Sequence, residues 1–117
     1  MAQVENRTEH TVTIANGAAL SNAVNLRGEV LVGLRMPAVW TAAGITFQVS
    51  MDNVTYQDLY AAGGGEVALT VVAAHQVALD PDGYAGARWV KVRSGTGAVP
   101  VNQGAERVFS IISRGIA

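Results

Sequence analysis

The stretch from Gly44 to Tyr60, GITFQVSMDNVTYQDLY, decides the fold that we expect. Its first half alternates apolar and polar residues, which is the period of a pleated strand with one buried face. This alternation places Ile45, Phe47, Val49 and Met51 on the core face and Thr46, Gln48 and Ser50 on the opposite face. Asp52 and Asn53 suit a tight reversal, and Val54 to Tyr60 is rich in β-branched and aromatic residues. The stretch therefore predicts a strand, a turn and a returning strand.

Further strands are predicted on both sides of this hairpin. Regular alternation predicts a strand over Glu29–Met36, with Val30, Val32, Leu34 and Met36 on one face and Leu31, Gly33 and Arg35 on the other. A second runs over Ala87–Arg93, with Val90 and Val92 on one side and Trp89, Lys91 and Arg93 on the other. Shorter patterns predict strands at Thr11–Ile14, Glu66–Val72, His75–Leu79 and Arg107–Ser113.

Turn residues separate these strands. Asn16-Gly17, Gly63–Gly65, Asp80–Gly83 and the Gly- and Pro-containing run Ser94–Gln103 mark the breaks. A helix is possible over Leu20–Leu26, but Asn22, Asn25 and Gly28 disfavour it and favour a strand with a bulge or an extended connection. A total of about eight short strands with marked turns predicts an all-β protein, an antiparallel β-sandwich or jelly roll.

The chain length fits one domain. With 117 residues, a single core is large enough without disulfides or a metal. We expect residues 11–117 to form this domain. Residues Met1–His10 are polar and aperiodic, which predicts an N-terminal arm that is either frayed or ordered by a neighbouring molecule.

Composition excludes several classes of site. The chain has no cysteine, which removes disulfides and thiolate chemistry, and its 8 basic and 9 acidic residues create no positive field for nucleic acid. Charged residues make up 15% of the chain, against about 25% in ordinary soluble domains, which suits a surface packed against copies or partners. No apolar run approaches a membrane span, and no signal-peptide pattern opens the sequence, so folding in the cytoplasm is expected.

The residues with catalytic or metal-binding chemistry do not form a recognisable set. His10 and His75 lack further ligands at metal-binding spacing. The acids Asp52, Asp58, Asp80 and Asp82 include candidates for Ca²⁺ binding or glycoside hydrolysis, but the three at turns are explained by turn chemistry. No serine lies in a G-x-S-x-G setting. We therefore expect a protein that is not an enzyme and uses no cofactor.

Two sets of side chains are candidates for binding. The aromatic residues Trp40, Tyr56, Tyr60, Tyr84 and Trp89 either stack on sugars or fill the core and subunit contacts, and the second interpretation is favoured because few aromatics are present. Arg88, Lys91 and Arg93 form a small basic cluster. Because Arg88 faces away from the other two, an ion pair on the sheet face or at an interface is favoured over a nucleic-acid site.

Two segments resemble a known family. Residues 47–60, FQVSMDNVTYQDLY, are similar to the strand-turn-strand pattern F-x-x-S-x-D-G-x-x-Y/W-x-x-L of galactose-binding-like jelly-roll modules, with Asn53 in place of the glycine. Residues 87–95, ARWVKVRSG, resemble the later A-R-Y-V-R-L strand of these modules. Over nearly the whole chain, the order of TVTIANGAALSNAVNLRG, MPAVWTAAGITFQVS, ALDPDGYAGARWVKVRSG and PVNQGAERVFSIIS is similar to small proteins encoded among the structural genes of tailed bacteriophages and prophages.

This resemblance implies a virion component, of the head decoration or cement type, or a small head-fibre or tail-associated module. It implies binding to the major capsid protein or other virion proteins as a homo-oligomer, with a trimer favoured, and no contact with nucleic acid or membrane. Candidate partner-binding residues are Glu5, Arg7, His10, Trp40, Tyr84 and Trp89. The alternative is a carbohydrate-binding module that uses loop aromatics such as Trp40 or Tyr84, and an enzyme ranks third.

Overall fold

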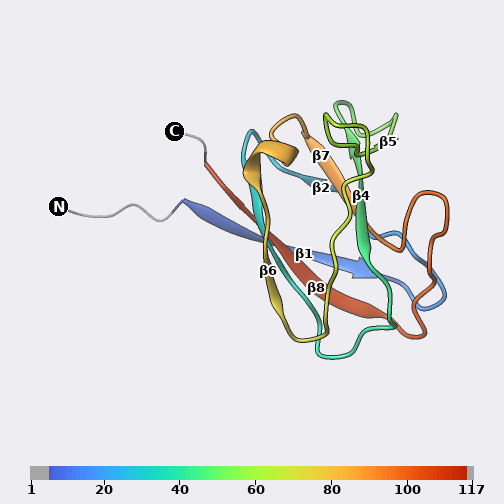
Figure 1. Ribbon diagram of the computed structural model, residues 1–117. Helices are drawn as coiled ribbons and strands as arrows, with labels where there is room; N and C mark the ends of the chain where they lie inside the picture. The colour runs from blue at the N-terminus through green and yellow to red at the C-terminus, as the bar shows by residue number, and fades with distance from the viewer. Residues whose placement is uncertain (1–5, 116–117) are drawn as a thin grey trace.

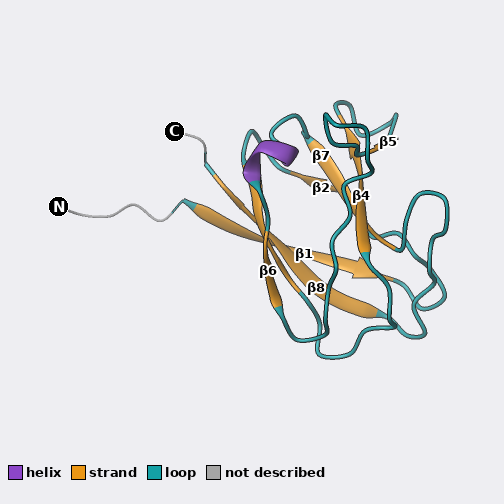
Figure 2. Cartoon of the chain, in the orientation of Figure 1, coloured by secondary structure: helices purple, strands orange, loops and turns teal. Residues whose placement is uncertain are grey.

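The computed structural model describes residues 6–115, which form two four-stranded antiparallel sheets (Figure 1). Sheet A has the strand order β1-β8-β3-β6, and sheet B has the order β2-β7-β4-β5. In chain order the elements are β1 Arg7–Ile14, β2 Val24–Asn25, β3 Val30–Arg35, β4 Ile45–Ser50, β5 Gln57–Asp58, β6 Gln76–Ala78, the 3₁₀ turn η1 Pro81–Tyr84, β7 Trp89–Ser94 and β8 Arg107–Arg114. Figure 2 shows that strands and loops make up nearly all of the molecule. The predicted all-β sandwich is confirmed.

The predicted hairpin is present and joins β4 to β5, with Gln48 opposite Asp58. Asn53 takes the positive φ of 60° that closes the turn. The Asp52 carboxylate accepts the backbone N–H groups of Val54 and Thr55, both at 2.9 Å. The returning strand is only two residues long, much shorter than the predicted Val54–Tyr60.

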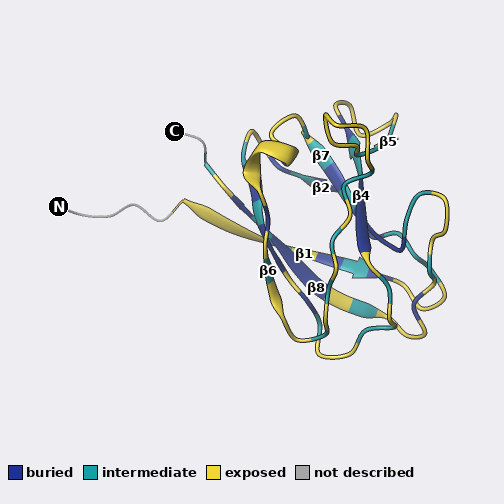
Figure 3. Ribbon diagram, viewed as in Figure 1, coloured by how far each residue is buried: buried dark blue, intermediate teal, exposed yellow. Residues whose placement is uncertain are grey.

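The core lies between the two sheets. Its members are buried because the strands turn alternate side chains inward, and Figure 3 shows the buried segments on the facing middle parts of the strands. Phe47 of β4 packs edge to face against Tyr84 of η1, with ring centroids 5.2 Å apart. Completely buried apolar residues are Val12, Ile14, Leu26, Leu31, Leu34, Ile45, Phe47, Val90, Val92 and Ile111.

The predicted faces of two strands need correction. Met51 is 64% exposed because the chain leaves β4 at Ser50 to enter the turn. Thr46 is completely buried on the face predicted to be open, because its hydroxyl donates to the Gly95 carbonyl and accepts from Arg93. In β3, a register shift between Leu31 and Gly33 breaks the alternation, so Leu31 and Leu34 are both buried.

Other elements differ in length from the prediction. Glu66–Val72 forms only isolated bridges, from Leu69 to Ile45 and from Glu66 to Tyr60. The stretch Leu20–Leu26 contains the short strand β2, paired with β7. The Asp80–Gly83 turn is the start of η1, whose N-cap is Asp80, with its carboxylate accepting the Asp82 N–H.

The N-terminal arm was predicted to extend to His10, and this boundary is wrong for Arg7–His10. Strand β1 begins at Arg7 and pairs with β8 along its whole length, from Arg7 opposite Arg114 to Ile14 opposite Arg107. Backbone pairing needs no apolar side chain, so the polar RTEH sequence hid this strand. The remaining arm residues Met1–Glu5 lie outside the described residues.

Candidate functional site

Strand β1 is an edge of sheet A, and part of its outer side is open. The Asn6 carbonyl accepts the Gly115 N–H, so the even-numbered residues of β1 turn their backbone groups to β8 and the odd-numbered residues turn theirs outward. Thr13 confirms this, because its outward N–H donates to Asn22 Oδ1 at 2.8 Å. Within residues 6–115, the outward backbone groups of Glu9 and Thr11 have no partner. This segment of β1 is therefore able to pair with another strand.

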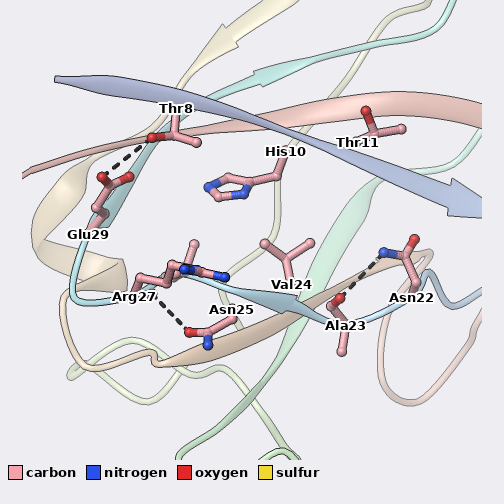
Figure 4. A pocket seen from close by; sticks show the side chains of 10 residues that line it. Thr8, His10, Thr11, Asn22, Ala23, Val24, Asn25, Arg27 and Glu29 are labelled. Carbon is pink, nitrogen blue, oxygen red and sulfur yellow. Dashed lines mark hydrogen bonds between the residues drawn. The ribbon is translucent and has the colours of Figure 1, made fainter. Parts of the chain in front are cut away.

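A groove of about 550 Å³ lies beside this edge. Thr8 and His10 descend from β1 on one side, and the segment that carries β2 forms the other side (Figure 4). The His10 ring points into the space between them. The lining is mostly polar and consists of Thr8, His10, Thr11, Asn22, Ala23, Val24, Asn25, Leu26, Arg27 and Glu29.

Three groups at this groove form a chain of hydrogen bonds. His10 Nε2 lies 2.8 Å from Ser113 Oγ, and Ser113 Oγ donates to Glu29 Oε1 at 2.6 Å. The serine has one proton, and Glu29 accepts it, so His10 Nε2 carries the hydrogen that it shares with Ser113. A nucleophilic serine would have to donate to the imidazole instead. This arrangement, with Ser113 fully buried, fixes the three side chains and does not activate the hydroxyl.

The chain of hydrogen bonds shifts two pKa values. The hydrogen bond from Ser113 lowers the pKa of Glu29, because it stabilises the carboxylate. Burial lowers the pKa of His10, while the Glu29 charge opposes that shift. Near neutral pH the groove therefore contains a neutral imidazole beside an ionised carboxylate.

A second cluster of charge lies on the outer face of sheet B. Arg93 of β7 is 5% exposed, and its guanidinium binds Asp58 at 2.8 Å and Glu66 at 2.7 Å. Glu66 also accepts the N–H of Gly97. The predicted ion pair on the sheet face is confirmed for Arg93, and it fastens β5 and the 95–100 loop to β7. Lys91 lies instead over the ring of Tyr56, 4.3 Å from its centroid.

The six predicted partner-binding residues do not converge on one site. Glu5 lies outside the described residues, whereas Arg7 and His10 both lie on β1 at the open edge. Trp40 packs edge to face on Phe109 at 5.6 Å and donates its indole N–H to the Ala43 carbonyl. Trp89 is half-buried in β7, opposite Asn25 of β2.

Tyr84 is buried, as the favoured interpretation of the aromatics holds. The carbohydrate-binding alternative and the partner-binding set placed it on an open loop, but it is 2% exposed and belongs to the core. Burial raises the pKa of its hydroxyl to about 12. In this conformation it has no face to offer a sugar.

Sequence reasoning missed the groove residues Asn22, Asn25, Arg27 and Glu29. The two asparagines were weighed only as residues that disfavour a helix. Their actual roles are local: Asn22 caps the edge of β1, and Asn25 Oδ1 accepts the Arg27 N–H in a turn where Arg27 has a φ of 55°. Only the pairing of distant strands shows that this segment faces β1.

Three exposed valines, Val39, Val72 and Val108, lie on segments that meet at Pro37, and we call them the apolar end. They are 63%, 53% and 54% exposed. The loops that carry Val39 and Val72 are joined by a hydrogen bond from the Ala74 N–H to the Pro37 carbonyl. Val108 adjoins Pro37, because both line a hollow of the surface, which is also lined by Met36, Phe109 and the polar residues Glu9, Thr11, Arg35 and Ser110.

Residues 6–115 contain no group of three or more histidines and acids placed to hold a metal ion. No helix in this range has the length and apolarity needed to cross a membrane. Comparisons of the chain with protein-family models, with curated proteins and with solved structures find no match.

Proposed function

We propose that this protein is a structural component of a bacteriophage virion, of the decoration or cement type, that binds the outer surface of the capsid and reinforces contacts between its subunits. The phage resemblance described above suggests the setting. The observation that carries the proposal is the apolar end, where Val39, Val72 and Val108 are more than half exposed on a chain that is poor in charge. Exposed apolar side chains on neighbouring segments are candidates for a docking surface.

The chemistry of this end suits a protein partner. Burying a valine side chain contributes about 1.5 kcal/mol, so three of them supply roughly 4 kcal/mol to an interface before other contacts are counted. Val108 lies on strand β8, and a hydrogen bond joins the two loops that carry Val39 and Val72, which lowers the ordering cost of binding. A single such contact is weak, but many copies on a symmetric shell reinforce it together.

The test uses empty shells assembled from the major capsid protein of the phage or prophage whose genome encodes this chain. Purified protein is mixed with empty shells, bound protein is measured by co-sedimentation, and shell melting is measured by calorimetry. We expect binding and a higher shell melting temperature. The triple variant Val39→Asp, Val72→Asp, Val108→Asp is expected to lose binding by at least about tenfold.

A matched control changes exposed apolar residues elsewhere. Met51, Val54 and Val99 are 64%, 82% and 66% exposed and lie in the 51–55 turn and the 95–100 loop. Their replacement by aspartate is expected to leave shell binding unchanged. Failure of the unaltered protein to bind the shells, or equal losses in both triple variants, contradicts the proposal.

A second candidate function is carbohydrate binding, and the polar groove beside β1 favours it. Its asparagine, arginine, glutamate and histidine side chains are the kinds that hydrogen-bond sugar hydroxyls. A glycan array probed with the protein tests this. Binding that Asn25→Ala and Arg27→Ala remove, together with absent shell binding, would make this the better assignment.

A further inference from the structure

We propose that two copies of this chain associate through their β1 strands, antiparallel about a two-fold axis at Thr8, and thereby join their A sheets into one continuous sheet. The proposal concerns a different surface from the apolar end and does not depend on the proposed function.

The backbone groups of β1 point alternately toward β8 and away from it. The Asn6–Gly115 and Thr13–Asn22 hydrogen bonds establish that Arg7, Glu9 and Thr11 turn their N–H and C=O groups away from β8. Asn22 occupies the edge at Thr13, so the open segment ends there. A second strand can therefore pair only with the N-terminal part of β1. In that pairing, the residues of the second strand whose backbone groups point outward must lie opposite the odd-numbered residues of β1.

The charges of Arg7 and Glu9 distinguish the possible registers of the strand pair. Two antiparallel β1 strands can place Arg7 opposite Arg7, Glu9 opposite Glu9, or Arg7 opposite Glu9. The first two registers oppose like charges, which destabilises a strand pair, whereas the third opposes unlike charges twice because of the two-fold symmetry. A fourth register, shifted by two residues beyond the one that pairs Glu9 with Glu9, places Arg7 opposite Thr13. The Thr13 N–H is already bonded to Asn22, so this register is blocked. The charges of the strand thus select the pairing centred on Thr8.

Glu9 is held in place on sheet A by two neighbouring side chains. Its carboxylate accepts from Ser110 Oγ at 2.6 Å and lies 2.9 Å from Arg35, on the outer face of sheet A. These contacts hold Glu9 in a defined position, with 50% of its side chain exposed. Arg7 of the second copy would approach the same carboxylate from the open side. Since Arg7 and Glu9 lie on the same face of β1, both ion pairs form on that face.

The association is expected to be weak, because a strand edge buries less area than a standard interface. Sedimentation velocity over about 10 µM to 1 mM protein should show a monomer that converts to a dimer. Amide hydrogen exchange should report the same event locally. The Glu9 amide should gain protection with rising concentration, whereas the Thr13 amide, already bonded, should not change.

Charge reversal gives a specific test of the register. Arg7→Glu places two acidic residues on the edge and Glu9→Arg places two basic residues there, so each variant alone should lose dimer formation by at least about tenfold. In an equimolar mixture of the two variants, residue 7 of each copy lies opposite a residue 9 of opposite charge in the other copy. Association should therefore return. The double variant Arg7→Glu, Glu9→Arg should also dimerise by itself. Circular dichroism checks that each variant is folded.

The proposal is overturned if the unaltered protein stays monomeric to about 1 mM, or if folded charge variants fail to associate when mixed. A trimer would likewise contradict the two-fold pairing. If a variant does not fold, the concentration dependence of Glu9 amide exchange in the unaltered protein still decides between pairing and no pairing.

Discussion

Arg93 illustrates how a single side chain connects separate parts of this protein. Its guanidinium is nearly buried and binds Asp58, Glu66 and Thr46, which come from three different segments of the chain. Removing one member of a buried charge cluster leaves the others without compensation. The local sequence around Arg93 indicates a strand residue but not this role, because its partners lie 27 to 47 residues away.

Replacing Arg93 by alanine is therefore expected to lower the free energy of unfolding by about 3 kcal/mol, because Asp58 and Glu66 lose their counter-charge. Urea denaturation followed by circular dichroism measures this. Lys91→Ala, on the same strand and face, is the control and should cost less than about 1 kcal/mol, since its contact with Tyr56 is a partly exposed cation–π interaction. Similar losses in both variants would contradict the role assigned to the ion cluster.

Tyr84 gives a second prediction for a single residue. Because it packs inside the core against Phe47, Tyr84→Ala should cost about 3 to 5 kcal/mol in stability, whereas Tyr84→Phe keeps the packing and should cost about 1 kcal/mol or less. Thermal unfolding measures both. An alanine variant of normal stability that had lost only glycan binding would mean that Tyr84 acts at the surface.

Among the elements, the β4–β5 hairpin is where sequence and structure agree most closely. Asp52 and Asn53 were expected at the turn because their side chains tolerate a reversal, and both do so through local contacts. The length of β5 was not predictable in the same way. Tyr56 has β-strand propensity, but its hydroxyl bonds Asn53 and its ring lies beneath Lys91, so the segment before Gln57 belongs to the turn.

The turn yields a prediction about backbone conformation. Asn53 has a φ of 60°, which is unfavourable for most side chains and easy for glycine. Asn53→Gly should change the stability by no more than about 1 kcal/mol, and Asn53→Val should lower it by about 2 kcal/mol. Chemical denaturation of the pair provides the measurement. If valine is tolerated as well as glycine, the turn does not hold this conformation in solution.

At the scale of the whole molecule, four shifted pKa values predict how stability responds to acid. Burial lowers the pKa of His10, so below its ordinary value of about 6.5 the unfolded chain takes up a proton that the folded chain resists. Hydrogen bonds lower the pKa of three carboxylates, from Ser110 to Glu9, from Ser113 to Glu29 and chiefly from the Thr55 N–H to Asp52. Their contribution is present above their ordinary pKa values and is lost as pH falls through the lowered ones.

Protonation of His10 and protonation of the three carboxylates both lower the stability of the folded protein. The urea concentration at the unfolding midpoint should therefore fall as the pH is lowered from about 7, first where His10 takes up a proton and then below about pH 4.5, where the carboxylates do. Denaturation curves over this range measure it. His10→Gln should remove the upper part of the decrease and leave the lower part. A midpoint that is constant or rises on acidification would contradict these assignments.

The sequence alone determined that the chain folds as an antiparallel β-sandwich, because alternation and turn residues are local signals that any strand must carry. It also located the hairpin and the ion-paired arginine strand. The tertiary structure alone decided where β1 begins, which faces are covered and where the open edge lies. These features depend on backbone pairing and on residues far apart in the chain: β8 recruits the polar Arg7–His10 segment, the 95–100 loop buries Thr46, and Asn22 closes part of an edge that would otherwise be open.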